Sequence, residues 1–145
     1  MRGRYVNAFL AAMLAGGLYA GQATAGTRTF FAVLNAGQET PLPNDSNALG
    51  VAYLTFDDKT LKVCYSVSYI SLSGPASAAH IHGPAAPGVS AAVLVALSPT
   101  ANPLNGCVTL PKANRKDLKH GMTYVNVHTA KFPGGEIRGQ IIPVR

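Results

Sequence analysis

The stretch TLKVCYSVSYI, residues 60–70, decides the fold class of this chain of 145 residues. Within it, large apolar side chains alternate with small or polar ones. Successive side chains of a β-strand point to opposite faces of a sheet, so this period of two predicts a strand with one buried face. The side chains expected on the buried face are Leu61, Val63, Tyr65, Val67 and Tyr69.

Several other segments are also typical of strands, and the turn-forming stretches PLPNDSN, DDKT, SGPAS, GPAAPG and KFPGG separate them. No segment after the first 25 residues has a helical period over ten or more residues. Six to eight short strands therefore predict an all-β domain, an antiparallel sandwich or a flattened barrel. The expected strands are RTFFAVLN from Arg28, GVAYLTFD from Gly50, SAAVLVAL from Ser90, MTYVNVHT from Met122 and GEIRGQIIPV from Gly135.

Residues 1–25 have the pattern of a secretory signal peptide. Two arginines precede an apolar run, and Ala23-Thr24-Ala25 resembles a cleavage site. The apolar run is short for a membrane span, and no later run is long enough to cross a bilayer. We therefore expect a soluble exported domain of residues 26–145, located in a periplasm or outside the cell.

The charge of the chain is basic but moderate. The formal net charge is +6 at pH 7, and removal of the signal would take away two arginines and no acid, which leaves +4. Such a charge attracts small anions but does not demand a nucleic acid, so we expect no nucleic-acid partner. The basic run KANRKDLKHG, residues 112–121, is interpreted as a solvated loop or a single helical turn.

The chain has two cysteines, Cys64 and Cys107. In an oxidising compartment they predict one disulfide, which closes a loop of about 44 residues and contributes roughly 4 kcal/mol in the chain-entropy model. A disulfide also removes both thiols as nucleophiles or metal ligands.

The stretch AAHIHGPAAPGV, residues 78–89, holds two of the four histidines of the chain. In a strand, His80 and His82 share one face while Ile81 takes the other. Because Ile81 belongs in the core, both imidazoles are expected to point away from it.

The same alternation applies to two later strands. In TYVNVHT, Val125 and Val127 are expected in the core, and in GEIRGQII the core positions are Ile137 and Ile141. The connection AKFPGG is short enough for a hairpin, so these two strands are expected to be neighbours. The polar side chains expected on the outer face are Tyr124, Asn126, His128, Glu136, Arg138 and Gln140.

Three imidazoles would meet on that outer face if the strand of His80 and His82 lies near His128. Neutral imidazoles suit copper or zinc, whereas calcium and magnesium prefer oxygen ligands. The alternative is that these histidines are ordinary polar surface. His120 stands beside a turn and is expected to be exposed, and Gln140 is interpreted as polar surface.

The two blocks AAHIHGPAAPGVSAAVLVAL and LKHGMTYVNVHTAKFPGGEIRGQI resemble the CHRD domain, a module named after chordin and found singly in many bacterial exported proteins. Weaker similarity extends over most of residues 26–145. The resemblance implies the fold more directly than the function. In chordin the module belongs to a secreted antagonist that binds growth factors.

A more distant likeness connects the chain with copper/zinc superoxide dismutases, which are Greek-key sandwiches. They carry an H-x-H pair, a later copper-binding histidine and then an arginine, and His80, His82, His128 and Arg138 follow in that order here. No histidine in the loop after His82 matches their bridging histidine. The likeness therefore implies a site with copper alone, in which Arg138 is a catalytic cation that attracts superoxide.

In this reading Tyr124, Asn126 and Glu136 would orient the imidazoles through their second nitrogens. Arg138 has a plainer alternative as a cross-strand partner of Glu136 or another acid. The activity would be that of a superoxide dismutase, or the chain would only carry copper.

Two other classes of function stay open. One is a noncatalytic module that binds another exported protein or a surface polymer. The other is a hydrolase, but no G-x-S-x-G motif is present and the few acids are scattered along the chain.

Overall fold

The computed structural model describes residues 26–98 and 101–144, which form nine strands and one short α-helix. The predicted signal peptide, residues 1–25, lies outside the described residues. The strands are β1 (Thr27–Asn35), β2 (Leu49–Asp57), β3 (Lys62–Ile70), β4 (Ala76–His82), β5 (Val93–Leu97), β6 (Leu104–Thr109), β7 (Tyr124–Thr129), β8 (Ile137–Gln140) and β9 (Ile142–Pro143).

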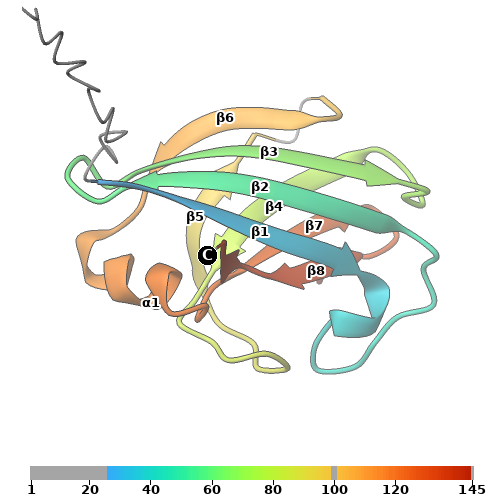
Figure 1. Cartoon of the computed structure of the whole chain (residues 1–145). Helices are drawn as coiled ribbons and strands as arrows, with labels where there is room; N and C mark the ends of the chain where they lie inside the picture. The colour runs from blue at the N-terminus through green and yellow to red at the C-terminus, as the bar shows by residue number, and fades with distance from the viewer. Residues whose placement is uncertain (1–25, 99–100, 145) are drawn as a thin grey trace, which may run out of the picture.

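All strand pairs are antiparallel, and the hydrogen-bonded order is β5-β4-β7-β8-β1-β2-β3-β6, with β9 beside β1. The end strands β5 and β6 approach each other and nearly close the sheet into a flattened barrel. In Figure 1, β6, β3, β2 and β1 form the upper layer and β5, β4, β7 and β8 the lower one. Because β7 returns to the side of β4 after β5 and β6, the chain follows a Greek-key order, although β5 and β6 are not hydrogen-bonded to each other. The predicted all-β barrel is confirmed.

The core lies between the two layers and is built by the predicted alternation. In β2 the buried positions are Gly50, Ala52, Leu54 and Phe56, with exposed side chains between them. In β3, Val63, Tyr65 and Val67 are buried, as the alternation in residues 60–70 predicts. Leu61 and Tyr69, also expected on the buried face, are only partly buried and pack against the core. The two inner faces supply most of the apolar cluster, which also includes Ile81, Leu97, Leu110, Leu118, Val125, Val127, Ile137 and Ile141.

The predicted C-terminal strand is divided in two. β8 ends at Gln140, and the backbone NH of Ile141 donates to the carbonyl of Thr123. Ile141 is buried in the core, while Ile142 pairs with Phe31 of β1 and is exposed. This break lets the chain leave β7 and continue along β1.

The basic run of residues 112–121 forms the 3-10 turn η2 (Lys112–Asn114) and the helix α1 (Arg115–Lys119). The run was expected to be a solvated loop or a single helical turn, and it is helical over more than one turn. Leu118 of this segment is buried in the core, and Lys119 Nζ lies 2.6 Å from Asp58 Oδ2. Among the described residues, no helix is long and apolar enough to cross a membrane.

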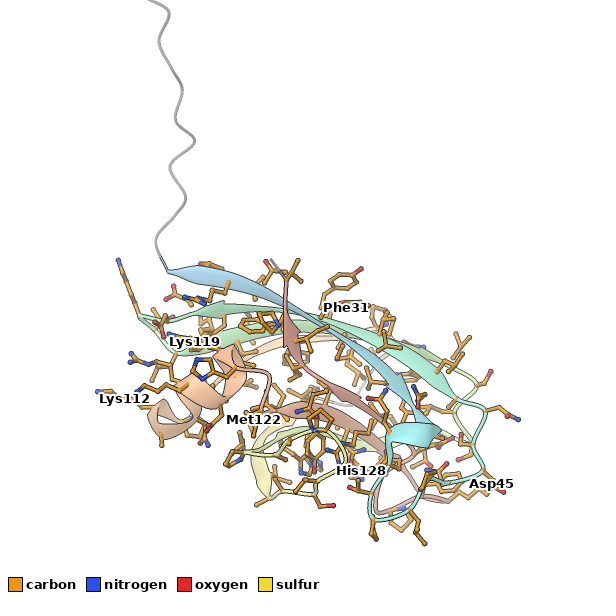
Figure 2. All side chains as sticks on the ribbon, turned by 60° about the horizontal axis from the view of Figure 1, so that its bottom comes forward. Phe31, Asp45, Lys112, Lys119, Met122 and His128 are labelled. Carbon is orange, nitrogen blue, oxygen red and sulfur yellow. A yellow bond between two sulfur atoms is a disulfide. The ribbon has the colours of Figure 1, made fainter. Side chains whose placement is uncertain are left out.

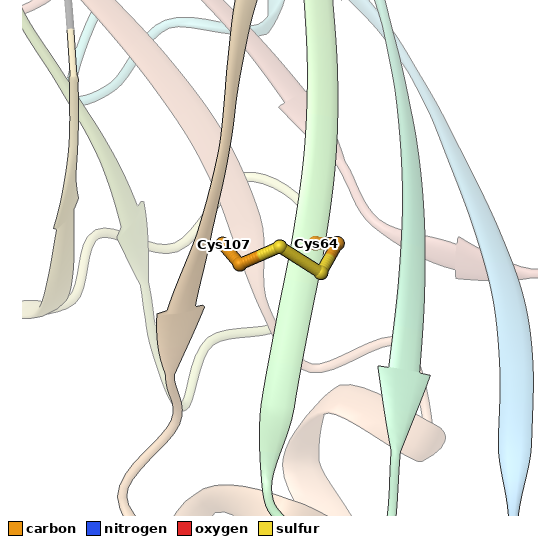
Figure 3. The surroundings of a disulfide bond; sticks show 2 residues. All are labelled: Cys64 and Cys107. Carbon is orange, nitrogen blue, oxygen red and sulfur yellow. A yellow bond between two sulfur atoms is a disulfide. The ribbon is translucent and has the colours of Figure 1, made fainter.

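A disulfide joins Cys64 of β3 to Cys107 of β6, as predicted. Figure 3 shows it between two neighbouring strands. The two cysteines are direct partners in the register, so the bond links the edge strand β6 to the rest of the upper layer.

Candidate metal centre

Strands β4, β7 and β8 lie side by side in the lower layer and carry the polar residues that the sequence analysis selected. Their register places His80 opposite Asn126, which is in turn opposite Arg138. Ile81, as predicted, points into the core. The polar side chains therefore share the face of the lower layer that points away from the core.

This outer face is not open to solvent, in contrast to the prediction. His82 and His128 keep 9% and 8% of their surface exposed, and Tyr124 and Asn126 are buried as well. The reason is that two loops, residues 36–48 and residues 83–92, lie below the lower layer (Figure 1). We call these segments the first and second covering loops.

The three predicted histidines meet beneath the covering loops. The ring centroids of His80 and His128 are 4.8 Å apart, those of His80 and His82 5.4 Å, and those of His82 and His128 6.3 Å. One ligand nitrogen from each ring lies within 4.8 Å of the others. Figure 2 shows His128 among the side chains between sheet and loops. His80 is the most exposed of the three.

Backbone carbonyls fix which nitrogen of two imidazoles carries the proton. His82 Nδ1 lies 3.0 Å from the carbonyl oxygen of Ala91, and His128 Nδ1 lies 3.0 Å from that of Pro133. A carbonyl oxygen only accepts, so both Nδ1 atoms donate and both Nε2 atoms carry a lone pair. The rings therefore present unprotonated Nε2 atoms to the centre of the cluster.

These lone pairs have different partners. His128 Nε2 accepts from His80 Nδ1 at 3.0 Å. His82 Nε2 is buried and has no hydrogen-bond partner among the described residues. A buried polar atom without a partner costs free energy. A group bound in the space that this nitrogen faces would remove that cost.

Burial lowers the pKa of all three imidazoles below the usual histidine value. For His80, repulsion from His128 and His82 lowers the pKa further. The hydrogen bonds to Ala91 and Pro133 partly offset the effect of burial on the pKa of His82 and His128. At neutral pH the cluster is therefore uncharged, which is the state that binds a metal.

The aromatic ring of Tyr124 stands between Arg138 and the histidine cluster. The guanidinium carbon of Arg138 lies 3.5 Å from the centre of the Tyr124 ring, and the Tyr124 and His82 rings are parallel within 4° at 4.8 Å. Since β7 lies between β4 and β8, Tyr124 separates His82 from Arg138. The arginine is only 2% exposed, yet its charge still contributes to the lowered pKa of His82.

Arg138 also ties the two covering loops together. Its Nη1 donates to Thr40 Oγ1 at 2.6 Å, and its Nη2 donates to the carbonyl of Val89 at 2.8 Å. Thr40 Oγ1 and Ser90 Oγ are 2.6 Å apart. The second covering loop thereby holds Ala91 where its carbonyl meets His82.

A buried carboxyl stands beside this arginine. Asn126 Nδ2 donates to Glu39 Oε1 at 2.6 Å and to the carbonyl of Ile137 at 3.1 Å. Burial raises the pKa of Glu39 to about 7, although the bond from Asn126 and the charge of Arg138 act in the opposite direction. Gly135 has a φ of +133°, and a Cβ there would meet Asn126 and Glu39 at 2.6 to 2.7 Å, so a larger residue would disturb this cluster.

The carboxylate of Glu136 accepts hydrogen bonds from other residues and does not bind an imidazole. It accepts from the hydroxyls of Ser46, Ser73 and Thr129 at 2.6 to 2.7 Å and from the backbone NH of Ser73 at 2.8 Å. Burial by itself would raise the pKa of Glu136, but these hydrogen bonds lower it below the usual value. Asn126, likewise, binds Glu39, and Tyr124 contacts His82 through its ring.

Four groups of the site were not predicted from the sequence: Glu39, Thr40 and the carbonyls of Ala91 and Pro133. Glu39 and Thr40 lie in NAGQETP, near residue 35, which belongs to the region of weaker CHRD resemblance, so that block was the available signal. A backbone carbonyl leaves no signal in the sequence, because every residue type has one.

The model of the CHRD domain family matches residues 30–141. This match spans most of the chain, which therefore belongs to the CHRD domain family. A search among curated proteins gives no match, and neither does a search among solved structures.

Proposed function

We propose that this CHRD-domain protein binds one copper ion through His80 Nδ1, His82 Nε2 and His128 Nε2. The observation that carries the proposal is the buried Nε2 of His82, which lies beside the other two ligand nitrogens and has no hydrogen-bond partner in the described chain. Nitrogens bound to a common ion at about 2 Å lie roughly 3 to 4 Å apart, so the rings need to move little.

Metal binding would change the hydrogen bonds of His80 but would leave its imidazole neutral. His80 Nδ1 would give up its bond to His128 Nε2 and become a ligand, while its proton moves to Nε2 of the same ring. His80 is the most exposed of the three, so the proton at Nε2 lies nearest to water. The other two rings already have the required tautomers.

Copper is the ion that the donor set favours. Three neutral imidazoles suit copper or zinc, and at a given nitrogen site the divalent ions follow an order of affinity with copper at its maximum. The neighbouring carboxylates of Glu39 and Glu136 are already engaged by Asn126 and by hydroxyl groups. They are therefore not oxygen ligands for a harder cation.

Beyond copper binding, we propose an activity like that of superoxide dismutase. A bound copper ion would supply one-electron chemistry by alternating between its two oxidation states. Arg138 would supply the charge that attracts the anion, since its positive charge acts on His82 across the ring of Tyr124. The net positive charge of the chain would add to this attraction.

The compartment is part of the same proposal. The disulfide between Cys64 and Cys107 is consistent with an oxidising environment such as a periplasm or the cell exterior. Secretion would bring the site into contact with superoxide and copper outside the cytoplasm.

Electron paramagnetic resonance of the purified protein with one equivalent of Cu(II) tests the metal site. We expect nitrogen coupling from imidazoles, which weakens or disappears in His128→Ala and persists in His120→Ala. His120 is the matched control because it is exposed and lies outside the cluster. A spectrum without nitrogen coupling, or one unchanged in His128→Ala, removes the proposal.

The activity needs a separate test. Superoxide consumption by the copper-loaded protein is compared with that of an equal amount of free Cu(II) and of the His128→Ala variant. A rate above both supports the enzyme, whereas a rate equal to that of free copper indicates a copper carrier. Zinc loading of the same protein is the control for metal binding without electron transfer.

The second candidate function is a noncatalytic binding module. Exposed apolar side chains on the upper layer favour it, among them Val33, Tyr53 and Ile70. A partner that binds there would be retained when His80, His82 and His128 are all replaced.

A further inference from the structure

Part of the outer face of β1, β2 and β3 is apolar and exposed. The side chains between the buried positions of these strands point away from the core, and Tyr53 and Ile70 keep 58% and 65% of their surface exposed. An exposed Leu or Val alone needs no explanation, but a contiguous group on one sheet does. We call this group the apolar face; it consists of Phe31, Val33, Leu49, Val51, Tyr53 and Ile70.

The register makes these side chains neighbours. Phe31 pairs with Tyr53, Val33 pairs with Val51, and Leu49 pairs with Ile70. The rings of Phe31 and Tyr53 have their centroids 4.9 Å apart and form a ridge across two strands. The apolar face is therefore one surface.

A hollow lies next to this ridge. It has a volume of about 350 Å³, and its exposed lining is almost entirely apolar. The lining residues are Val33, Leu49, Gly50, Val51, Ser68, Tyr69 and Ile70. Ridge and hollow thus stand side by side on the same sheet.

The apolar face carries no charge. On the outward side of β2 and β3 the charged residues are Asp57 and Lys62, both at the far end of the strands from Leu49 and Ile70. The chain as a whole is basic, so two copies repel each other over most of their surface. The apolar face is the place where they meet without bringing like charges together, and it offers no charged group to an acidic or basic partner.

The size of the apolar face fits a modest interface. Six large side chains, four of them at least half exposed, amount to roughly 500 Å² of apolar surface per copy. Two such faces bury about 1,000 Å², which is below the roughly 1,200–2,000 Å² of stable interfaces and fits a weak, reversible one.

We infer that the apolar face binds a second copy of this chain around a twofold axis. In such a pair both copies use the same patch. If residue i of the first copy contacts residue j of the second, then residue j of the first copy also contacts residue i of the second. The ridge of Phe31 and Tyr53 in one copy fills the hollow beside Val51 in the other, and the reverse contact follows by symmetry. The two sheets then pack face to face, as the layers of a β-sandwich do.

This pairing does not depend on the metal site. Figure 2 shows Phe31 and His128 on opposite sides of the molecule. The pairing therefore covers neither histidine cluster, and a failure of one proposal leaves the other untouched.

Sedimentation equilibrium over a range of protein concentrations tests the inference. We expect reversible association of the wild-type protein into a dimer, and a dissociation constant that rises roughly tenfold to a hundredfold in Tyr53→Lys. Tyr53 is exposed in the single copy, so its replacement leaves the core intact. Circular dichroism and the copper spectrum, which should match those of the wild type, check this directly.

Thr27→Lys is the matched control. It adds the same charge to an exposed position at the far end of β1, opposite Asp57 and outside the apolar face. Its dissociation constant should stay close to that of the wild type. A wild-type protein that stays monomeric up to about 1 mM, where an interface of this size should associate, overturns the inference, as does equal association in folded Tyr53→Lys.

Discussion

The two outer faces of this barrel have opposite characters, although the same alternation of side chains builds both. On β4, β7 and β8 the outward residues are polar and are covered by two loops, whereas on β1, β2 and β3 no loop of the described chain covers the outward residues, and six of them form the apolar face. A strand pattern determines which way a side chain points, but the rest of the chain determines what covers it. The covered face depends on hydrogen bonds to loops, and the bare face depends on pairing between its own strands.

The largest expected effect is on the bare layer, where the disulfide holds β6 against β3. Replacing both Cys64 and Cys107 by Ser should lower the free energy of unfolding by roughly 4 kcal/mol, because the loop between them is no longer closed in the unfolded chain. Denaturant titration measures this loss. The copper spectrum should stay unchanged, because the cysteines lie in the upper layer and the histidines in the lower one.

The variant without the disulfide tests whether the two layers are independent. If the nitrogen coupling of bound Cu(II) is lost together with stability in conditions where the protein is folded, the two faces are not independent. The comparison between them then fails.

Arg138 carries the next largest effect, on the covered face. Arg138→Gln should destabilise the fold by about 3 kcal/mol, since the carbonyl of Val89, the hydroxyl of Thr40 and the carboxyl of Glu39 lose a buried cation. Hydrogen exchange should also become faster at the backbone NH of Ala91, which donates to Tyr124 Oη at 3.2 Å.

Arg115→Gln is the control for this change. Arg115 is more than a third exposed, and its Nε lies 3.6 Å from Asp58 Oδ1, so its loss should cost no more than about 0.5 kcal/mol. Equal losses in the two variants would mean that the covering loops are held by something other than the arginine.

The covered face should also make stability depend on pH through Glu39. Its pKa is raised from 4.5 to about 7 in the folded state, so the neutral form is favoured there. The stability that this provides is fully present below pH 4.5 and is lost as the pH rises towards and through 7. In Glu39→Gln an uncharged side chain occupies the position at every pH, so the wild type should lose about 2 kcal/mol relative to this variant between pH 4.5 and 7.5.

Thermal or denaturant unfolding of both proteins across this range measures the difference. Asp45→Asn serves as the control for the loss of a carboxylate, because Asp45 has a largely exposed side chain. A constant difference between Glu39→Gln and the wild type would contradict the raised pKa.

The sequence predicts the directions of side chains in this barrel better than their surroundings. The alternation in residues 60–70 and in TYVNVHT predicts correctly that Val63 and Val125 are buried and that His128 points away from the core. The meeting of His128 with His80 required the pairing of β4 with β7, which are far apart in the chain and which no turn connects. The resemblance to other proteins, not the period, indicated it.

The covering loops could not be predicted in the same way. Residues 36–48 and 83–92 have no regular period, and their contacts with the sheet are made largely by single polar groups such as Thr40 Oγ1 and the carbonyl of Ala91. The histidines were therefore expected at the surface and are found buried. The raised pKa of Glu39 follows from the same cover, since a lone acid in a loop would otherwise be solvated.

The smallest expected effect compares the same substitution at an outward position of β2 and at a buried position of β7. Val51→Thr on the bare face should change the free energy of unfolding in dilute solution by no more than about 0.5 kcal/mol, because the hydroxyl remains in water. Val127→Thr places the same hydroxyl in the core, where it displaces a methyl group among apolar neighbours, and should cost about 2 kcal/mol. Denaturant titration at micromolar concentration measures both. If Val51→Thr proved as costly as Val127→Thr while the protein is monomeric, then Val51 would be covered within a single chain, and the face on which we place the second copy would not be bare.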